Sequence, residues 1–319
     1  MDAKTPPEAT GHAATVLPAG RRRKDTWRSA LSYRAQYAGA RTLESALCAL
    51  SPDRASALMG AALGTVMPHT SRHARALEHI AFAMPETDEA ERERIARGMW
   101  HNLGRVAGEA FHMPRLLAER DRVSFPAEFS DYQALCRDGV IGATPHLGNW
   151  EVAGLISSVS GLRMAGVYQA LHNPLMERRV RMLRGPIYPA GLFAKGPKLG
   201  ATLLRLARQG AAIGLVADLR EARGVDVEFF ARPAYATPLP AMLARASGRP
   251  LVAGAMVRTG GVAFKALVEP IPRIETSDRD RDIAETTQAL HDVFERWIRA
   301  YPDQWMWTHR KWARRRPGQ

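Results

Sequence analysis

The chain has 319 residues, of which 46% are hydrophobic and 24% charged, a composition typical of a globular protein with a sizeable core. Its formal net charge of +13 favours a polyanionic partner such as nucleic acid, an anionic membrane, an acidic carrier protein or a phosphorylated substrate. The chain has only two cysteines, Cys48 and Cys136, so the sequence excludes a fold built on disulfides and favours reduced thiols in a cytosolic setting.

Residues 1–26 are predicted to form a disordered basic arm. They are rich in Pro, Ala, Thr and Gly, and they end in the basic run Arg21-Arg22-Arg23-Lys24. They lack the apolar centre of a secretory signal peptide, so we expect none. The longest apolar stretch of the chain, residues 55–67, is too short to span a bilayer as a helix.

Residues 27–120 are predicted to form a helical section that associates with a membrane. Apolar residues recur at helical spacing beside arginines over residues 27–50, and Ser51-Pro52 provide a cap and a first-turn proline for a second helix. These first helices could pack into the core or lie on a membrane surface, and the pattern leaves both interpretations open. Further helices are expected over residues 69–84 and 86–113.

Residues 121–319 are predicted to form an α/β core that is one structural unit with the helical section. Predicted strands alternate with helices, which implies a mainly parallel central sheet covered by helices on both faces. The ligand crevice of such a sheet lies at the carboxyl ends of its strands. The expected strands are 139–144, 163–168, 211–217, 225–230, 251–257 and 262–268, and the expected helices are 128–138, one from about 150, 174–184, 196–208, 240–247 and 280–300.

The stretch around His146 has the pattern of a catalytic site. His146 follows the end of a buried strand, and Glu151 is expected in the first turn of the next helix, folded back toward the imidazole. Such a carboxylate would keep one ring nitrogen protonated and leave the other free to take a proton from a hydroxyl. A hydrogen-bonded core histidine is the competing interpretation. No second histidine follows at the helical spacing of zinc motifs, so we expect no metal.

The run His146-Leu147-Gly148-Asn149-Trp150-Glu151 resembles the His-x4-Glu box of the lipid A late acyltransferases (lauroyl or myristoyl), a branch of the lysophospholipid acyltransferase superfamily. The resemblance covers the chain from about Trp27 onward and is most specific at residues 301–312. It also includes Val167-Tyr168, Asn173-Pro174-Leu175, Gly214-Leu215-Val216-Ala217-Asp218 and Val227-Glu228-Phe229-Phe230.

This resemblance implies a glycerolipid acyltransferase-like fold and transfer of a fatty acyl chain to a hydroxyl of a membrane lipid, most directly a lipid A precursor. The acyl donor would be acyl carrier protein or acyl-CoA, used as a co-substrate, with no bound cofactor. The implied location is the cytoplasmic face of the bacterial inner membrane, with peripheral or monotopic attachment. Acyl carrier protein, the lipid acceptor and the anionic membrane surface are thus the expected partners.

The resemblance also implies roles for individual residues. Asp218 would join His146 and Glu151 as a catalytic residue, although a turn or helix-cap role is the alternative for a strand-end aspartate. Arg184 would bind a phosphate or carboxylate of a substrate, unless it belongs to a solvated helix face. Asn149, Tyr168, Asn173 and Lys195 are further expected substrate-binding residues.

Two positions depart from the family pattern, because Lys195 and Gln169 stand where arginine is usual. These departures weaken the assignment to the standard lipid A phosphosugar and leave a lysophospholipid or glycolipid as the alternative acceptor. Phe230-Ala231 likewise replaces the common Phe-Gly.

The residue pattern favours direct transfer over an acyl-enzyme, because the chain has no Gly-x-Ser-x-Gly elbow. Backbone N–H groups of Gly148 and Asn149 are the hypothetical oxyanion donors. The aromatic and basic tail over residues 305–316 is interpreted as core and membrane interface, and we expect no nucleic-acid partner because no nucleic-acid motif accompanies it. A basic nucleic-acid-binding protein and a catalytically silent membrane-binding relative are the alternatives outside the enzyme class.

Overall fold

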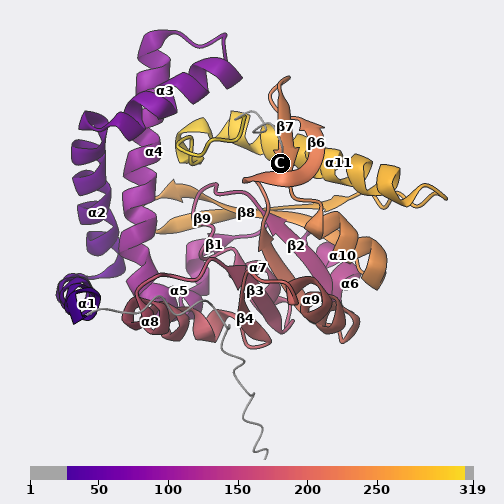
Figure 1. Cartoon of the computed structure of the whole chain (residues 1–319), viewed down its shortest axis with the longest axis horizontal. Coiled ribbons are helices and arrows are strands. Elements are labelled where there is room, and N and C mark those ends of the chain that lie inside the picture. The colour runs from indigo at the N-terminus through magenta and orange to yellow at the C-terminus, as the bar shows by residue number, and fades with distance from the viewer. Residues whose placement is uncertain (1–26, 313–319) are drawn as a thin grey trace, which may run out of the picture.

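The computed structural model describes residues 27–312. The predicted basic arm and the last residues of the basic tail, 313–319, lie outside the described residues. Helices from the first part of the chain stand beside an α/β body that contains all the strands described (Figure 1). None of the helices within residues 27–312 combines the length and the hydrophobicity needed to cross a membrane.

The helical section is built on a close pair, α2 (Pro52–Val66) and α4 (Glu89–Glu109). The Ser51 side chain caps α2 by accepting a hydrogen bond from the backbone N–H of Arg54. A Cβ atom on Gly104 of α4 would lie 2.2 Å from the carbonyl oxygen of Met59, so only glycine allows this approach of the two helices. The other helices here are α1 (Trp27–Cys48), η1 (Met67–His69), α3 (Ser71–Ala83), η2 (Ala110–His112), α5 (Met113–Ala118) and η3 (Arg120–Arg122).

The α/β body contains a seven-stranded sheet in the order β1-β9-β8-β2-β5-β3-β4. Neighbouring strands are parallel except β8 and β9, which pair antiparallel. The strands are β1 (Val123–Ser124), β2 (Val140–Thr144), β3 (Met164–Tyr168), β4 (Gly191–Ala194), β5 (Ala212–Val216), β8 (Leu251–Gly260) and β9 (Ala263–Ile271). A separate antiparallel pair is formed by β6 (Arg220–Glu228) and β7 (Pro233–Ala236).

Apolar clusters lie on both faces of this sheet. Successive residues of β2 point to opposite faces, so Ile141 and Val140 enter different clusters. The Ile141 side is covered by α9 (Leu199–Arg208), α10 (Leu239–Ser247), α11 (Arg279–Ala300) and parts of α3 and α4. The Val140 side is covered by α5, α6 (Phe129–Cys136) and α7 (Gly154–Val159). The predicted α/β class, with helices on both faces and a helical N-terminal section, is confirmed.

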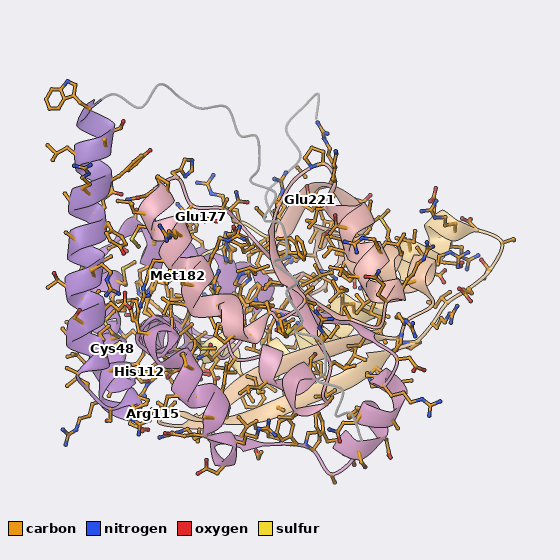
Figure 2. The ribbon with its side chains drawn as sticks, turned by 90° about the horizontal axis from the view of Figure 1, so that it is seen from below. Cys48, His112, Arg115, Glu177, Met182 and Glu221 are labelled. Carbon is orange, nitrogen blue, oxygen red and sulfur yellow. The ribbon has the colours of Figure 1, made fainter. Side chains whose placement is uncertain are left out.

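One long helix, α1, lies at the side of the molecule. In Figure 2 its Cys48 end is beside His112, whose Nε2 lies 3.2 Å from the Leu47 carbonyl oxygen. It also contacts α8 (Pro174–Arg184), which carries Glu177 and Met182 in the same view. The side chains of Leu31 and Leu43 on α1 are 62% and 46% exposed. This helix therefore leaves apolar side chains uncovered within the described residues.

The element boundaries depart from prediction mainly around the His146 loop. The helix expected near Trp150 begins at Gly154, because tight turns occupy the intervening residues and Asn149 Oδ1 accepts the N–H of Glu151 at 3.1 Å. Strands β1, β4 and β7 were not predicted. β4 lacks apolar alternation and is only half-buried, so its pattern does not indicate a strand.

Candidate active site

His146 and Asp218 meet at the carboxyl end of two neighbouring strands. β2 and β5 pair in parallel with Thr144 opposite Val216, so residues shortly after each strand come together. His146 Nδ1 lies 2.8 Å from Asp218 Oδ1, and the backbone N–H of His146 donates to Asp218 Oδ2 at 2.9 Å. The imidazole and the carboxylate thus form a doubly fixed pair.

The buried carboxylate of Asp218 stays ionised in this pair. Burial raises its pKa, but the neighbouring His146 and three hydrogen bonds outweigh burial and hold the pKa well below its usual range. The third hydrogen bond comes from the Trp305 indole, whose Nε1 donates to Oδ2 at 2.8 Å. Because a carboxylate only accepts, His146 Nδ1 must carry the hydrogen, and Nε2 is left to accept a proton.

Glu151 does not take the place that was predicted for it. Its carboxylate is bound by Arg184, with Nε donating to Oε2 at 2.9 Å and Nη2 donating to Oε1. The physical reason is local, since Glu151 lies in a turn before the helix rather than in a first helical turn. The predicted contact between Glu151 and the imidazole was therefore wrong. Asp218 is the carboxylate that pairs with the His146 ring.

The loop after β2 is pinned by its backbone. Gly148 has φ +62°, and a Cβ atom there would lie 1.9 Å from the Met256 carbonyl oxygen. The Gly148 N–H donates to the Gln304 carbonyl at 3.1 Å, and the Asn149 N–H donates to the Met256 carbonyl at 2.8 Å. Both hypothetical oxyanion donors are thus already engaged, and that hypothesis was wrong for this conformation.

The C-terminal segment completes the site from the other side. Met306 N–H donates to the His146 carbonyl at 3.2 Å, and Trp305 forms a bridge with Leu147. Trp305 and Trp307 are 1% and 0% exposed, so both indoles fill the core. This agrees with the interpretation of the tail as part of the core. The hydrogen bond from Trp305 to Asp218 was missed, because no local pattern tells which distant carboxylate an indole will reach.

A cavity of about 400 Å³ opens beside the His146 imidazole. His146 and Trp150 line it after the end of β2, whereas Val140 lines it at the start of that strand, about 13 Å away at the usual rise of a strand. The lining farther along is mostly apolar and includes Phe129, Tyr132, Cys136, Ile156, Leu162, Met164, Val252 and Val268. A cavity of this shape accommodates an extended hydrocarbon better than a polar group.

The other predicted substrate-binding residues divide into two groups. Tyr168 and Lys195 line the cavity together with Glu151 and Arg184, and the Lys195 side chain is exposed. Asn149 and Asn173 are buried and do not line it. Asn173 Oδ1 accepts from the N–H groups of Leu175 and Met176, so this residue caps α8. Both asparagine side chains therefore make hydrogen bonds within the fold and do not face the cavity.

The sequence profile of the bacterial lipid A biosynthesis acyltransferases matches residues 22–314. The chain belongs to this family. Two similar relatives, from strains CDC 1551 / Oshkosh and H37Rv of Mycobacterium tuberculosis, are phosphatidylinositol mannoside acyltransferases. Each is 28% identical to this chain over 219 residues, which cover 66% of this chain and 67% of the relative. The protein is accordingly an acyltransferase.

This acyltransferase has further buried titratable groups next to the pair of His146 and Asp218. The His309 and His146 ring centroids are 5.0 Å apart, and burial lowers the pKa of His309 to about 4. Lys311 Nζ lies 3.1 Å from His291 Nε2, and burial lowers the pKa of His291 to about 3 and that of Lys311 to about 8. His309 is therefore a neutral ring beside His146.

No group of three or more His, Cys, Asp or Glu side chains within residues 27–312 is arranged to hold a metal ion. Cys136, at the end of the cavity away from His146, is buried, and burial raises the pKa of its thiol to about 11. Tyr188 also lines the cavity, and burial together with the charge of Glu151 raises its pKa to about 12. Both groups are neutral near pH 7.

Proposed function

We propose that this acyltransferase moves a fatty acyl chain from acyl carrier protein, or from acyl-CoA, to a hydroxyl of a membrane lipid by direct attack. The observation that carries the proposal is the position of His146. Its Nδ1 side is bound by a buried carboxylate, while the ring lines the open end of an apolar cavity. The ring is thus oriented to act as a general base on a group that enters the cavity mouth.

The proposed reaction has two proton movements. The acceptor hydroxyl gives its proton to His146 Nε2 as its oxygen bonds to the thioester carbonyl carbon. The carbon–sulfur bond then breaks, and the leaving thiolate takes the proton from the imidazolium. Asp218 stays ionised and stabilises the imidazolium formed in between.

The cavity supports a fatty acyl group as the transferred unit. Its far walls are apolar, so binding there removes hydrocarbon from water, worth about 0.8 kcal/mol for each buried methylene. The only cysteine among its lining residues, Cys136, is a weak nucleophile because burial raises the pKa of the thiol to about 11. Direct transfer is therefore favoured over a thioester intermediate on the enzyme.

Two cations at the cavity support an anionic substrate. Arg184 is held by Glu151, which fixes the direction of the guanidinium, and Lys195 is exposed. We propose that they bind phosphate of the donor or the acceptor. Tyr168, which lines the same cavity, is proposed as a further substrate contact.

Two acceptors are proposed. A lipid A precursor is the first, because the chain belongs to the bacterial lipid A biosynthesis acyltransferases. A glycolipid is the second, because the two mycobacterial relatives are named for a phosphatidylinositol mannoside. Lysine in place of arginine at position 195 is a reason to test the second acceptor with equal care.

We propose peripheral attachment to the cytoplasmic face of the inner membrane. The exposed apolar side chains of α1 and the net charge of +13 support contact with an anionic lipid surface. The same positive charge suits an acidic acyl carrier protein.

The test measures transfer of a radiolabelled acyl chain, carried on acyl carrier protein or on CoA, to each of three acceptors. The acceptors are lipid A precursor, phosphatidylinositol mannoside and lysophospholipid. The native protein is compared with His146→Ala. We expect one labelled lipid product with the native protein and none with the folded variant. Undiminished transfer by the variant would sink the role of His146. A native protein that labels none of these lipids would contradict the proposed acceptor class.

A further inference from the structure

Glu109 is a fully buried carboxylate that lies outside the cavity. Both of its oxygens are occupied, Oε1 by Ser56 Oγ at 2.6 Å and by Arg258 Nη1 at 2.7 Å. Oε2 accepts from Asn149 Nδ2 at 2.6 Å and from Arg258 Nη2 at 3.0 Å. These contacts join α2, α4, β8 and the loop after His146 through one side chain.

The contact with Asn149 fixes which way the amide faces. A carboxylate only accepts hydrogen bonds, so the NH2 group of Asn149 must face Glu109. The amide oxygen then faces the other way, where it accepts the N–H of Glu151 at 3.1 Å. Glu109 therefore determines the turn that separates His146 from Glu151.

A second route from Glu109 reaches the same loop. Arg258, held by both carboxylate oxygens, donates from Nε to Asn102 Oδ1 at 3.1 Å. That contact directs the NH2 group of Asn102 to the carbonyl of Gly148, at 2.9 Å. The peptide groups immediately after His146 are thus held on two sides by groups that Glu109 orients.

We propose that Glu109 is a positioning residue for acyl transfer, which acts through Asn149 and Arg258 on the loop that carries His146. The proposal rests on the proposed function of His146 as base. Stability alone does not require this arrangement, because a buried ion pair can often be replaced by apolar side chains without loss of stability. A pair that fixes the polarity of two amides gives the loop one defined conformation.

The central test compares Glu109→Gln with the reciprocal double variant Glu109→Gln/Asn149→Asp. The amide introduced by E109Q alone places an NH2 group against the NH2 group of Asn149 or against Arg258. In the double variant the new amide donates to the new carboxylate, which also accepts the N–H of Glu151. The contact between positions 109 and 149 is thus restored and the network keeps its net charge, while position 109 loses its hydrogen bond with Arg258 Nη2. We expect E109Q to lower kcat about 100-fold with KM for the acyl donor unchanged, and the double variant to recover most of kcat.

Glu93→Gln is the matched control. It makes the same substitution on the same helix, about 24 Å away along α4, at a carboxylate that pairs with His73 and Arg97. We expect native kcat from this control. Circular dichroism and thermal unfolding give the folded fraction of every variant, and kcat is calculated per folded molecule. If E109Q does not fold, the test rests on the folded double variant. A kcat of the double variant as low as that of Asp218→Asn would overturn the proposal.

A second readout needs no substrate. Nitrogen-labelled histidine gives a ring signal for His146, identified by its loss in His146→Ala. We expect this signal to shift in folded E109Q and to return in the double variant, with no shift in E93Q. An unmoved signal in folded E109Q would overturn the positioning role. If the native protein transfers no acyl group but the His146 signal still shifts in E109Q, the positioning role stands and the proposed function fails.

Discussion

His146 and Asp218 form a hydrogen-bonded pair across 72 residues of chain, whereas Glu151, five residues from His146, binds Arg184. The carboxylate that orients the proposed base is thus not the one inside the His-x4-Glu box. In this protein the box joins the proposed base to a residue that holds an arginine at the cavity.

This division predicts different kinetics for the two carboxylates. Asp218→Asn is expected to lower kcat by about 10⁴-fold, because asparagine stabilises the wrong imidazole tautomer. Glu151→Gln is expected to act mainly on KM for a phosphate-bearing substrate, since it loosens Arg184. Steady-state kinetics of both folded variants against the same substrates will check this ranking. Loss of kcat in E151Q together with near-native D218N would reverse the assignment.

The cavity predicts control of acyl length by position along β2. Gly142 lines the cavity, and a Cβ atom there has its nearest neighbour at 3.7 Å, so Gly142→Val fits while narrowing the middle. Cys136→Phe fills only the far end. We expect both variants to favour shorter donors, G142V more strongly, at a cost of roughly tenfold or more in kcat/KM for each methylene that no longer fits.

The measurement is kcat/KM over a series of acyl donors of increasing length. Cys48→Phe is the matched control, because Cys48 is exposed and does not line the cavity. A uniform loss over all lengths in the cavity variants would contradict the assignment of the cavity to the acyl chain.

How much of this arrangement was predictable depends on the range of the interactions. α8 was predicted with its observed bounds, because Asn173 and Pro174 provide the cap and the first-turn proline in the local sequence. Asp218, like His146, was placed at the carboxyl end of a strand, where the ligand crevice of an α/β sheet lies. Those features follow from neighbours in sequence and from the topology of an α/β sheet.

The missing parts are partner choices between distant residues. The sequence does not indicate which distant residues Asn149, Glu109 and Trp305 contact. Only the packed fold brings Asn149 to Glu109 and Trp305 to Asp218. The helix after His146 was placed too early for a related reason, since the Asn149 side chain forms a turn in place of a helix start.

Buried neutral histidines predict loss of stability in mild acid. Burial lowers the pKa of His291 to about 3 and that of His309 to about 4, below the value near 6.5 of an unfolded chain. As pH falls below about 6.5 the unfolded chain binds protons that the folded chain does not. The free energy of unfolding should then decrease, with a slope that approaches roughly 1.4 kcal/mol per pH unit for each ring.

Urea unfolding followed by tryptophan fluorescence at pH 7, 6 and 5 will measure this slope. His309→Gln should remove the share of one ring, up to roughly 1.4 kcal/mol per pH unit. Asp218 does not contribute in this range, because its pKa is lowered and its stabilisation is lost only below the unfolded value of 3.8. An equal slope in H309Q and the native protein would show that His309 is not buried neutral.

The uncovered side chains of α1 predict binding to lipid. Leu31 and Leu43 are 62% and 46% exposed, so Leu31→Glu/Leu43→Glu is expected to reduce sedimentation with anionic vesicles without altering thermal stability. Leu135→Glu is the control, because Leu135 is 47% exposed on α6, across the molecule from α1 (Figure 1). Equal loss of binding in the control would indicate that charge alone, rather than α1, governs attachment.

The hydrogen bond from Trp305 to Asp218 also has a consequence for synthesis of the chain. The ribosome adds the indole 87 residues after the carboxylate, which takes roughly 4 to 17 s at usual elongation rates. During that interval the nascent protein has its aspartate and its histidine but not the tail that fixes them. The proposed acyl transfer should therefore begin only once Trp305 has been synthesised and packed against Asp218, rather than build up as the sheet forms.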